Sequence, residues 1–173
     1  MNASKTLTIN TQVEASTVSG LSGILARTIA TSPAAGPLFI RWALAITIFP
    51  HGAQKLLGWW GGYGFEGTMN FFTQQMGIPY LFALGAILVE FFAPLLLVAG
   101  IATRYAALSV GIVLGVAAIM VQLPNGFFMN WLGNQAGEGI QFTLLYLGGV
   151  ASLLASGGGR WSVDSEIAGR LCK

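Results

Sequence analysis

An apolar run from Tyr80 to Ile101 contains a single charged residue, Glu90. A run of this length can cross a bilayer as one helix. A charged side chain at mid-membrane costs roughly 2.5 to 3.5 kcal/mol on insertion scales, so proteins keep one there where it faces a partner, a cavity or a site. Glu90 is therefore the strongest single indication of where this chain carries out its function.

Three further runs are long and predominantly apolar, which predicts four membrane spans in all. Hydrophobic residues make up 54% of the chain and charged residues 8%, against about 25% charged residues in soluble domains. Backbone groups in lipid must find partners within their own segment, so each run is expected to be a helix. The predicted fold class is all-α, an integral membrane bundle of four transmembrane helices over residues 37–157. The four predicted spans are Leu38–Leu57, Tyr80–Ile101, Tyr105–Leu123 and Ile140–Ser156.

The distribution of Lys and Arg predicts the orientation of these spans. Seven of the eight basic residues flank one side and Lys55 alone flanks the other, and basic residues favour the cytoplasmic side. Both termini are therefore expected in the cytoplasm, and the protein is expected to be a multi-pass protein of the inner (plasma) membrane. Residues 1–36 are predicted to form a flexible tail with an interfacial helix, and residues 158–173 a cytoplasmic tail. The seven basic residues are Lys5, Arg27, Arg41, Arg104, Arg160, Arg170 and Lys173.

Polar residues concentrate in the predicted outer half of the bundle. His51 and Glu90 differ in depth by about one helical turn, and Lys55 shares a helical face with His51. Gln122 and Glu138 flank the outer ends of the third and fourth spans. We expect these side chains to line a polar pocket open to the outer face. A histidine beside a carboxylate can move protons near neutral pH, so His51 and Glu90 are the candidate catalytic residues.

Structural roles could also explain these residues. Glu90 can act as a clasp between helices, bonded to His51 or to a backbone group. Lys55 can extend its side chain to the membrane interface. Arg41 and Arg104 fit the role of topology signals at the inner face.

Several classes of function lack sequence support. No basic run interleaved with aromatic residues suggests nucleic-acid binding. One histidine and one cysteine, His51 and Cys172, do not make a transition-metal cluster, so no metal site is predicted. No CxxCH, Walker or dinucleotide-binding motif occurs. Any electrons must therefore come from a partner or be exchanged with a bound quinone.

A series of short segments resembles the DoxX/DoxD family of small four-helix membrane proteins. The similarity covers roughly residues 36–166, and the order and spacing of the segments carry it. They are Phe-Pro-His-Gly-Ala-Gln-Lys-Leu-Leu-Gly (49–58), Gly-Ile-Pro (77–79), Glu90, Leu-Leu-Leu-Val-Ala-Gly-Ile-Ala-Thr-Arg-Tyr-Ala-Ala (95–107), Asn-Gly-Phe-Phe (125–128), Glu138 and Gly-Gly-Gly-Arg-Trp-Ser-Val-Asp (157–164).

The resemblance implies a four-helix bundle and a link to thiosulfate:quinone oxidoreduction, terminal quinol oxidases or membrane redox-stress complexes. The polar positions of the family correspond here to His51, Lys55, Glu90, Arg104 and Glu138. With His51 and Glu90 as the candidate catalytic residues, the candidate substrate-binding residues are Lys55, Gln122, Glu138 and Arg104. Gln122 stands where some members carry a histidine, so a second proton carrier or metal ligand is absent there. A quinone is the implied ligand, with no covalently bound cofactor.

Two main hypotheses follow from the sequence. The chain is a membrane subunit of a quinone-linked redox system, or it is a non-catalytic scaffold or assembly subunit of a larger membrane complex. The expected partners are the lipid bilayer and either partner membrane subunits or further copies of the chain. Whether the chain is itself an enzyme is left open. A small-solute carrier is a weaker third alternative, because no inverted repeat is visible.

Overall fold

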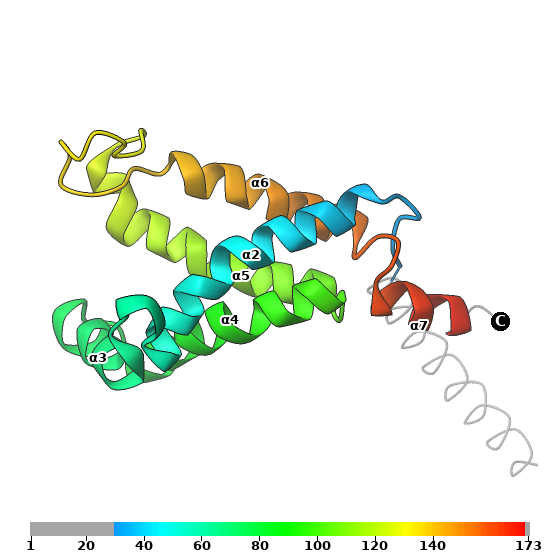
Figure 1. The fold of residues 1–173 in the computed structure, drawn as a ribbon, viewed down its shortest axis with the longest axis horizontal. Helices are drawn as coiled ribbons and strands as arrows, with labels where there is room; N and C mark the ends of the chain where they lie inside the picture. The colour runs from blue at the N-terminus through cyan, green and yellow to red at the C-terminus, as the bar shows by residue number, and fades with distance from the viewer. Residues whose placement is uncertain (1–29, 172–173) are drawn as a thin grey trace, which may run out of the picture.

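The computed structural model describes residues 30–171, and this part of the chain contains helices and no strand. The predicted all-α fold class is therefore confirmed for the described residues. Four long helices make up the body of the molecule (Figure 1): α2 (Gly36–Leu57), α4 (Tyr80–Ala99), α5 (Thr103–Ala117) and α6 (Gln141–Ser156). Their bounds lie close to the four predicted runs, although α5 continues as a π-helical segment, η3 (Ala118–Gln122). The predicted N-terminal interfacial helix lies outside the described residues.

Proline and glycine mark the helix ends. Pro37 occupies the first turn of α2, where its missing N–H is no loss. Gly58 and Gly100 follow α2 and α4 with φ of 72° and 69°. This left-handed conformation suits glycine and ends helices. The short turn after Gly100 then makes α4 and α5 an antiparallel hairpin.

The loop between α2 and α4 forms helical turns at one end of the bundle. It contains η1 (Trp59–Gly61), α3 (Gly64–Asn70) and the π-helical segment η2 (Phe71–Gln75). Met69 of α3 is buried and belongs to the smaller core that joins this loop to the bundle. Gly77, with φ of 68°, and Pro79, the N-cap of α4, close the loop. We call this end of the bundle the α3 end.

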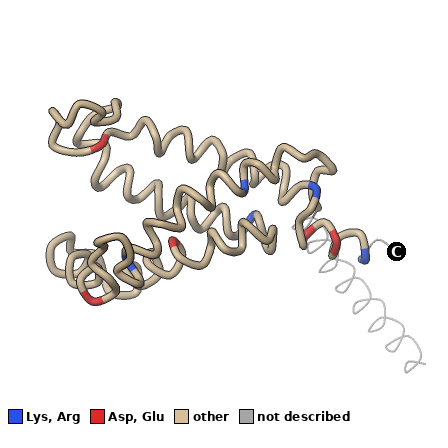
Figure 2. Tube along the Cα trace, viewed as in Figure 1, with Lys and Arg blue, Asp and Glu red and all other residues tan. Residues whose placement is uncertain are grey.

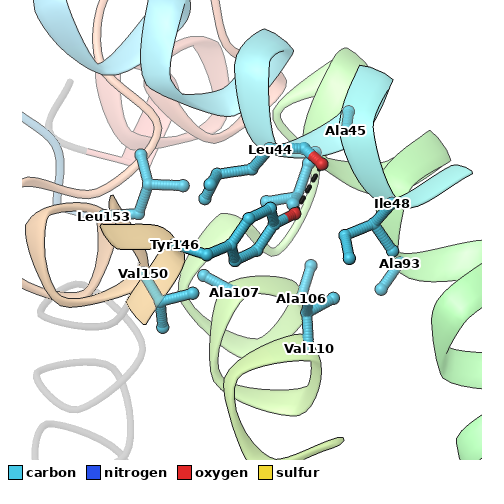
Figure 3. Packing of buried hydrophobic residues seen from close by; sticks show 11 residues of the cluster. Leu44, Ala45, Ile48, Ala93, Ala106, Ala107, Val110, Tyr146, Val150 and Leu153 are labelled. Carbon is cyan, nitrogen blue, oxygen red and sulfur yellow. Dashed lines mark hydrogen bonds between the residues drawn. The ribbon is translucent and has the colours of Figure 1, made fainter. Parts of the chain in front are cut away.

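The helices pack in a closed order, with α2 and α5 each contacting both α4 and α6. The main hydrophobic core joins all four helices (Figure 3). Its residues lie toward the end of the bundle away from α3. A second, smaller core joins α2, α3, η2 and α4 at the α3 end. Buried members of the main core include Leu44, Leu97, Val110, Tyr146 and Leu153.

The C-terminal segment folds back over the other end of the bundle, which we call the α7 end. Here α7 (Val163–Leu171) follows a loop that begins at Gly157. The carboxylate of Asp164 accepts hydrogen bonds from the backbone N–H groups of Ala102 and Thr103, both at 2.8 Å. These are first-turn donors of α5 that would otherwise lack partners. The segment predicted to be a tail is therefore part of the folded bundle up to this contact.

Two of the described helices, Tyr80–Ala99 and Thr103–Asn125, are long and apolar enough to cross a membrane, and Gln141–Ser156 is a shorter apolar helix. Charged residues are sparse along the long helices (Figure 2). The membrane-like character of the chain is thus supported. Four spans with cytoplasmic termini remain a prediction.

Candidate functional site

Glu90 forms an ion pair with Lys55, which joins the middle of α4 to the last turn of α2. The Lys55 ammonium nitrogen lies 2.6 and 2.5 Å from the two carboxylate oxygens of Glu90. The Glu90 side chain is 5% exposed and that of Lys55 is 30% exposed. Charge-assisted hydrogen bonds of this length are among the stronger ones in proteins. Glu90 thus has a charged partner that offsets its burial, and this partner is Lys55 rather than His51.

The pair can form because α2 and α4 approach very closely at Gly52. A Cβ atom on Gly52 would lie 2.3 Å from the Glu90 carbonyl oxygen, so only glycine fits there. Pro94 follows Glu90 by four residues within α4 and has no N–H, so the Glu90 carbonyl lacks its usual helical donor. The ion pair therefore sits at a locally altered stretch of α4 pressed against α2.

Aromatic and aliphatic side chains of the α3 end cover the Lys55 side of the pair. The Lys55 ammonium lies 5.7 Å from the centre of the Phe72 ring, within the range of a cation–π interaction. Phe72 in turn packs on the smaller core of Met69, Ala83 and Ile87. Of the two roles predicted for Lys55, a pocket residue or an anchor at the membrane interface, the structure favours the first, because its ammonium turns toward the buried carboxylate of Glu90.

His51 lies one helical turn before Lys55 on α2, and its side chain is exposed. The predicted contact between His51 and Glu90 is therefore replaced by the contact between Lys55 and Glu90. His51 remains near the pair in sequence and on the same helical face as Lys55. The His51 side chain is therefore accessible from outside the bundle.

Gln122 and Glu138 belong to a different part of the molecule from the ion pair. The Thr143 hydroxyl donates to the Gln122 side-chain carbonyl at 2.6 Å, which joins η3 to α6. The Glu138 carboxylate accepts a hydrogen bond from the Asn130 N–H at 2.7 Å within the 126–140 loop. Figure 1 shows this loop and the α3 segment apart from each other at the same end of the bundle. Of the residues predicted to line one polar pocket, the structure therefore joins Lys55 with Glu90 but places Gln122 and Glu138 apart from them.

Arg104 lies at the α7 end, far along the bundle from the ion pair. Its guanidinium donates hydrogen bonds to the carbonyls of Leu154, at 2.8 Å, and Ala155, at 3.2 Å. These are carbonyls of the last turn of α6, where a cation is favourable. Arg104, predicted to bind substrate, thus caps a helix. In residues 30–171 no three His, Cys, Asp or Glu side chains gather in a way that could hold a metal ion.

Arg41 is fully buried at the α7 end. Its guanidinium binds backbone carbonyls of both α4 and the C-terminal loop. It donates to Leu97 at 2.8 Å and Val98 at 3.0 Å in α4, and to Trp161 at 3.0 Å in the C-terminal loop. The sequence predicted Arg41 only as a topology signal at the inner face and did not indicate these contacts. Arg41 ties α2 and α4 to the segment that carries Asp164.

An apolar groove of about 350 Å³ lies between α2 and α4, on the α7 side of the ion pair. We call it the proline groove because a proline from each helix lines it. None of the predicted polar site residues is among its lining residues. The lining residues are Ala45, Ile46, Phe49, Pro50, Pro94, Leu95 and Val98.

Comparison with known proteins places the chain in a family. The DoxX family model matches residues 36–123, just over half of the chain, from the start of α2 past the end of η3. The chain belongs to the DoxX family. DoxX proteins are membrane-associated and are often linked with quinone-dependent redox systems. The resemblance drawn from the sequence is thereby confirmed.

The DoxX match contains both partners of the ion pair and the close approach at Gly52. It ends before the 126–140 loop and α6. The chain is also 28% identical over 132 residues to an uncharacterized protein of Haemophilus influenzae, over 75% of this chain and 82% of that relative. No solved structure matches the chain.

Three residues outside the predicted site hold the helices of the DoxX bundle together. Gly52 permits the contact of α2 with α4. Tyr146 donates its hydroxyl to the Leu44 carbonyl inside the main core (Figure 3). Asp164 caps α5 from the C-terminal segment. The sequence held a signal for two of them, since Gly52 and Asp164 both lie in segments that resemble the family.

Proposed function

We propose that this DoxX protein is a membrane subunit of a quinone-linked redox system, of the thiosulfate:quinone oxidoreductase or quinol oxidase type. The observation that carries the proposal is the ion pair between Lys55 and the buried carboxylate of Glu90 in the family-matched part of the chain. Ionisable residues within membrane helices mark substrate paths and proton relays more often than they serve packing alone. We further propose four spans, cytoplasmic termini and a location in the inner membrane, based on the distribution of Lys and Arg.

The chemistry of the pair suits a neutral ligand that gains or loses protons. The Lys55 ammonium can donate a hydrogen bond to a quinone oxygen. The Glu90 carboxylate can accept a proton from a quinol hydroxyl group, and His51, one turn away, can pass a proton onward. Oxidation of a quinol to a quinone releases two protons and two electrons. The electrons go to a partner subunit, since the chain carries no motif for a redox cofactor.

A scaffold or assembly role is the second candidate, and one observation favours it. The charge of Glu90 is already paired with that of Lys55, and Gly52 allows α2 to pack directly against α4 at the same place. A clasp of this kind holds a bundle together without any ligand. Its partners would be membrane subunits of a larger complex, or further copies of the chain.

Activity measurements on membranes separate the two candidates. We expect Glu90→Gln and His51→Ala to leave the protein inserted but to abolish the redox activity, which is oxidation of thiosulfate by quinone in one type of system and oxidation of quinol in the other. Glu66→Gln, the same change at an exposed position of α3, should keep full activity. Full activity in both site variants contradicts the redox proposal.

Purification from native membranes gives a second, independent test. Mass spectrometry of the purified protein should detect quinone together with partner subunits. A tightly held complex without quinone, in which Glu90→Gln still assembles and works, supports the scaffold role instead.

A further inference from the structure

The loop at residues 126–140 exposes large apolar side chains at the α3 end of the bundle. The exposed fractions are 68% for Phe128, 84% for Trp131 and 85% for Leu132. Large apolar residues grouped on a surface mark a contact with another protein or with a membrane. We call these three residues, together with Phe127, which is 46% exposed, the apolar loop surface.

The two ends of this loop bond to each other through their backbones. The N–H groups of residues 139–141 donate to carbonyls of residues 126–128 over distances of 2.9 to 3.2 Å. Two of these donors, Ile140 and Gln141, are the N-cap and the first residue of α6, where N–H groups otherwise lack partners. An unpaired backbone group finds no partner in lipid, so this pairing suits a segment that borders a bilayer.

Polar side chains of the loop also bond within it. The Glu138 carboxylate accepts a hydrogen bond from the Asn130 N–H at 2.7 Å. The Asn130 side chain donates to the Gln135 carbonyl at 3.1 Å and accepts from the Gln135 N–H at 3.0 Å. Protein interfaces usually contain about one hydrogen bond per 100–200 Å². Because these polar groups are already bonded, the outward surface is mainly apolar and suits lipid better than a protein partner.

The loop lies where its neighbouring helices reach the membrane surface. The helix Thr103–Asn125 has 23 residues, or roughly 35 Å at 1.5 Å per residue, against about 30 Å for the hydrocarbon core of a bilayer. The hydrogen bond from Thr143 to Gln122, at 2.6 Å, places the end of this helix beside the start of α6. With these helices across the bilayer, as proposed above, the loop leaves and re-enters the bundle at the level of the lipid headgroups.

The other connection at the α3 end has the same character. Trp59, Trp60 and Tyr63 are 50%, 64% and 83% exposed, and both connections lie at one end of the bundle (Figure 1). Trp and Tyr favour the headgroup region, because their rings are apolar and carry one polar group. Two separate segments thus present interfacial aromatic residues at the same end of the molecule.

Positive charge does not contribute to the apolar loop surface. Residues 123–140 contain no Lys or Arg, and their one acidic residue, Glu138, is bonded within the loop. Basic residues at a membrane surface attract anionic lipids. A loop without them should bind neutral and anionic bilayers alike.

We propose that the apolar loop surface inserts into the boundary between headgroups and acyl chains, in the leaflet at the α3 end. The partner is a phospholipid surface, and burial of apolar side chains holds the loop there without any contact to a lipid charge. The inference goes beyond the redox function and does not depend on it. It rests only on the proposed passage of the helix Thr103–Asn125 through the bilayer.

Fluorescence quenching in phosphatidylcholine vesicles tests this inference. The reporter is the full-length chain with Trp131 as its sole tryptophan, because phenylalanine replaces Trp42, Trp59, Trp60 and Trp161. Brominated acyl chains quench a tryptophan that they contact. We expect Trp131 to lose more fluorescence with lipid brominated near the headgroup than with lipid brominated near the chain end, and to lose little to iodide in the water.

Two further measurements guard the result. The difference in quenching between wild type and Trp131→Phe reports on Trp131 with a single substitution, so it does not rely on folding of the multiple variant. Ile112 is 59% exposed near the middle of the helix Thr103–Asn125. In the chain without native tryptophans, Ile112→Trp should show the opposite order, with stronger quenching by bromine near the chain end.

The outcomes separate this inference from the proposed spans. Quenching of Trp131 by iodide but not by brominated lipid overturns the inference, and leaves the surface to a protein partner. Lipid quenching of Trp131 that appears only after phosphatidylglycerol is added overturns the anchor without charge. If Ile112→Trp also escapes quenching by lipid, the proposed span fails too, whereas normal quenching of this variant limits the failure to the loop.

Discussion

The ammonium of Lys55 lies within 2.6 Å of both carboxylate oxygens of Glu90, and this contact joins the last turn of α2 to the middle of α4. A lone carboxylate at this depth would be costly. The pairing with Lys55 offsets this cost. Because the Lys55 side chain is partly exposed, a ligand can reach the pair. The same contact can hold α2 against α4 and can also bind a ligand, so stability and activity must be measured separately.

Removal of one partner of the pair should destabilise the protein more than removal of both. A charge left without its partner in a buried place is costly, up to about 3–5 kcal/mol for fully buried pairs. Lys55 is 30% exposed, so we expect roughly 2 kcal/mol for Glu90→Leu. The double variant Lys55→Met with Glu90→Leu should regain most of this loss in thermal unfolding in detergent.

The double variant also separates the two roles of the pair. If it recovers stability but not quinone-dependent activity, the pair is part of a site. Equal destabilisation by the single and the double variant would contradict the idea that the charges compensate each other.

Substitution of Gly52 by alanine should force α2 and α4 apart. The new Cβ atom would lie 2.3 Å from the Glu90 carbonyl oxygen, against backbone that cannot turn aside. Overpacking of this kind costs about 1–3 kcal/mol. Thermal unfolding should therefore occur at a lower temperature.

A matched glycine within α4 provides the control. Gly85 has no atom within 4 Å of an added Cβ, so Gly85→Ala should be neutral or should stabilise the helix by about 0.5–1 kcal/mol. Similar melting temperatures for the two variants would rule out the close contact at Gly52.

Loss of the Asp164 carboxylate should loosen the start of α5. Asp164→Ala leaves the N–H groups of Ala102 and Thr103 without acceptors, and loss of a helix cap costs about 0.5–2 kcal/mol. Hydrogen exchange at the start of α5 should increase. Glu166→Ala, at an exposed position of α7, should leave this exchange unchanged, and equal effects of the two would contradict the cap.

Replacement of Arg41 by lysine should destabilise the α7 end although the charge is kept. The guanidinium reaches carbonyls of Leu97, Val98 and Trp161 at once, and an ammonium cannot match this planar geometry. We expect a loss of about 2 kcal/mol, since hydrogen bonds to charged groups contribute roughly 1.5–3 kcal/mol. Arg170→Lys, at an exposed position of α7, is the control for thermal unfolding, and a stable Arg41→Lys protein would refute this role.

Prediction from sequence was reliable for the helices and weaker for side-chain contacts. The runs of apolar residues and the glycine and proline signals are local, so the bounds of α2, α4 and α6 could be predicted within a few residues. The family resemblance was confirmed by the match to residues 36–123. The partner of Glu90 was not predicted, because His51 and Lys55 share one face of α2 and depth alone favoured His51.

The expected gathering of polar residues shows the same limit. Gln122 and Glu138 lie at the same end of the bundle as Lys55, and a depth estimate cannot separate them. The structure pairs Gln122 with Thr143 and places Glu138 in its own loop. Lateral position across a bundle depends on which faces the helices present to one another, and a single sequence carries little of this information.

The sequence by itself determined that this chain forms apolar helices with one costly carboxylate, because helix length, hydrophobicity and helix ends follow from neighbouring residues. Only the tertiary structure decided that Lys55 meets this carboxylate, that Gly52 and Pro94 shape the contact, and that an apolar groove lies between the same two helices. The physical reason is that these features depend on how closely α2 and α4 approach and how each is rotated. Packing sets both quantities across residues far apart in the chain.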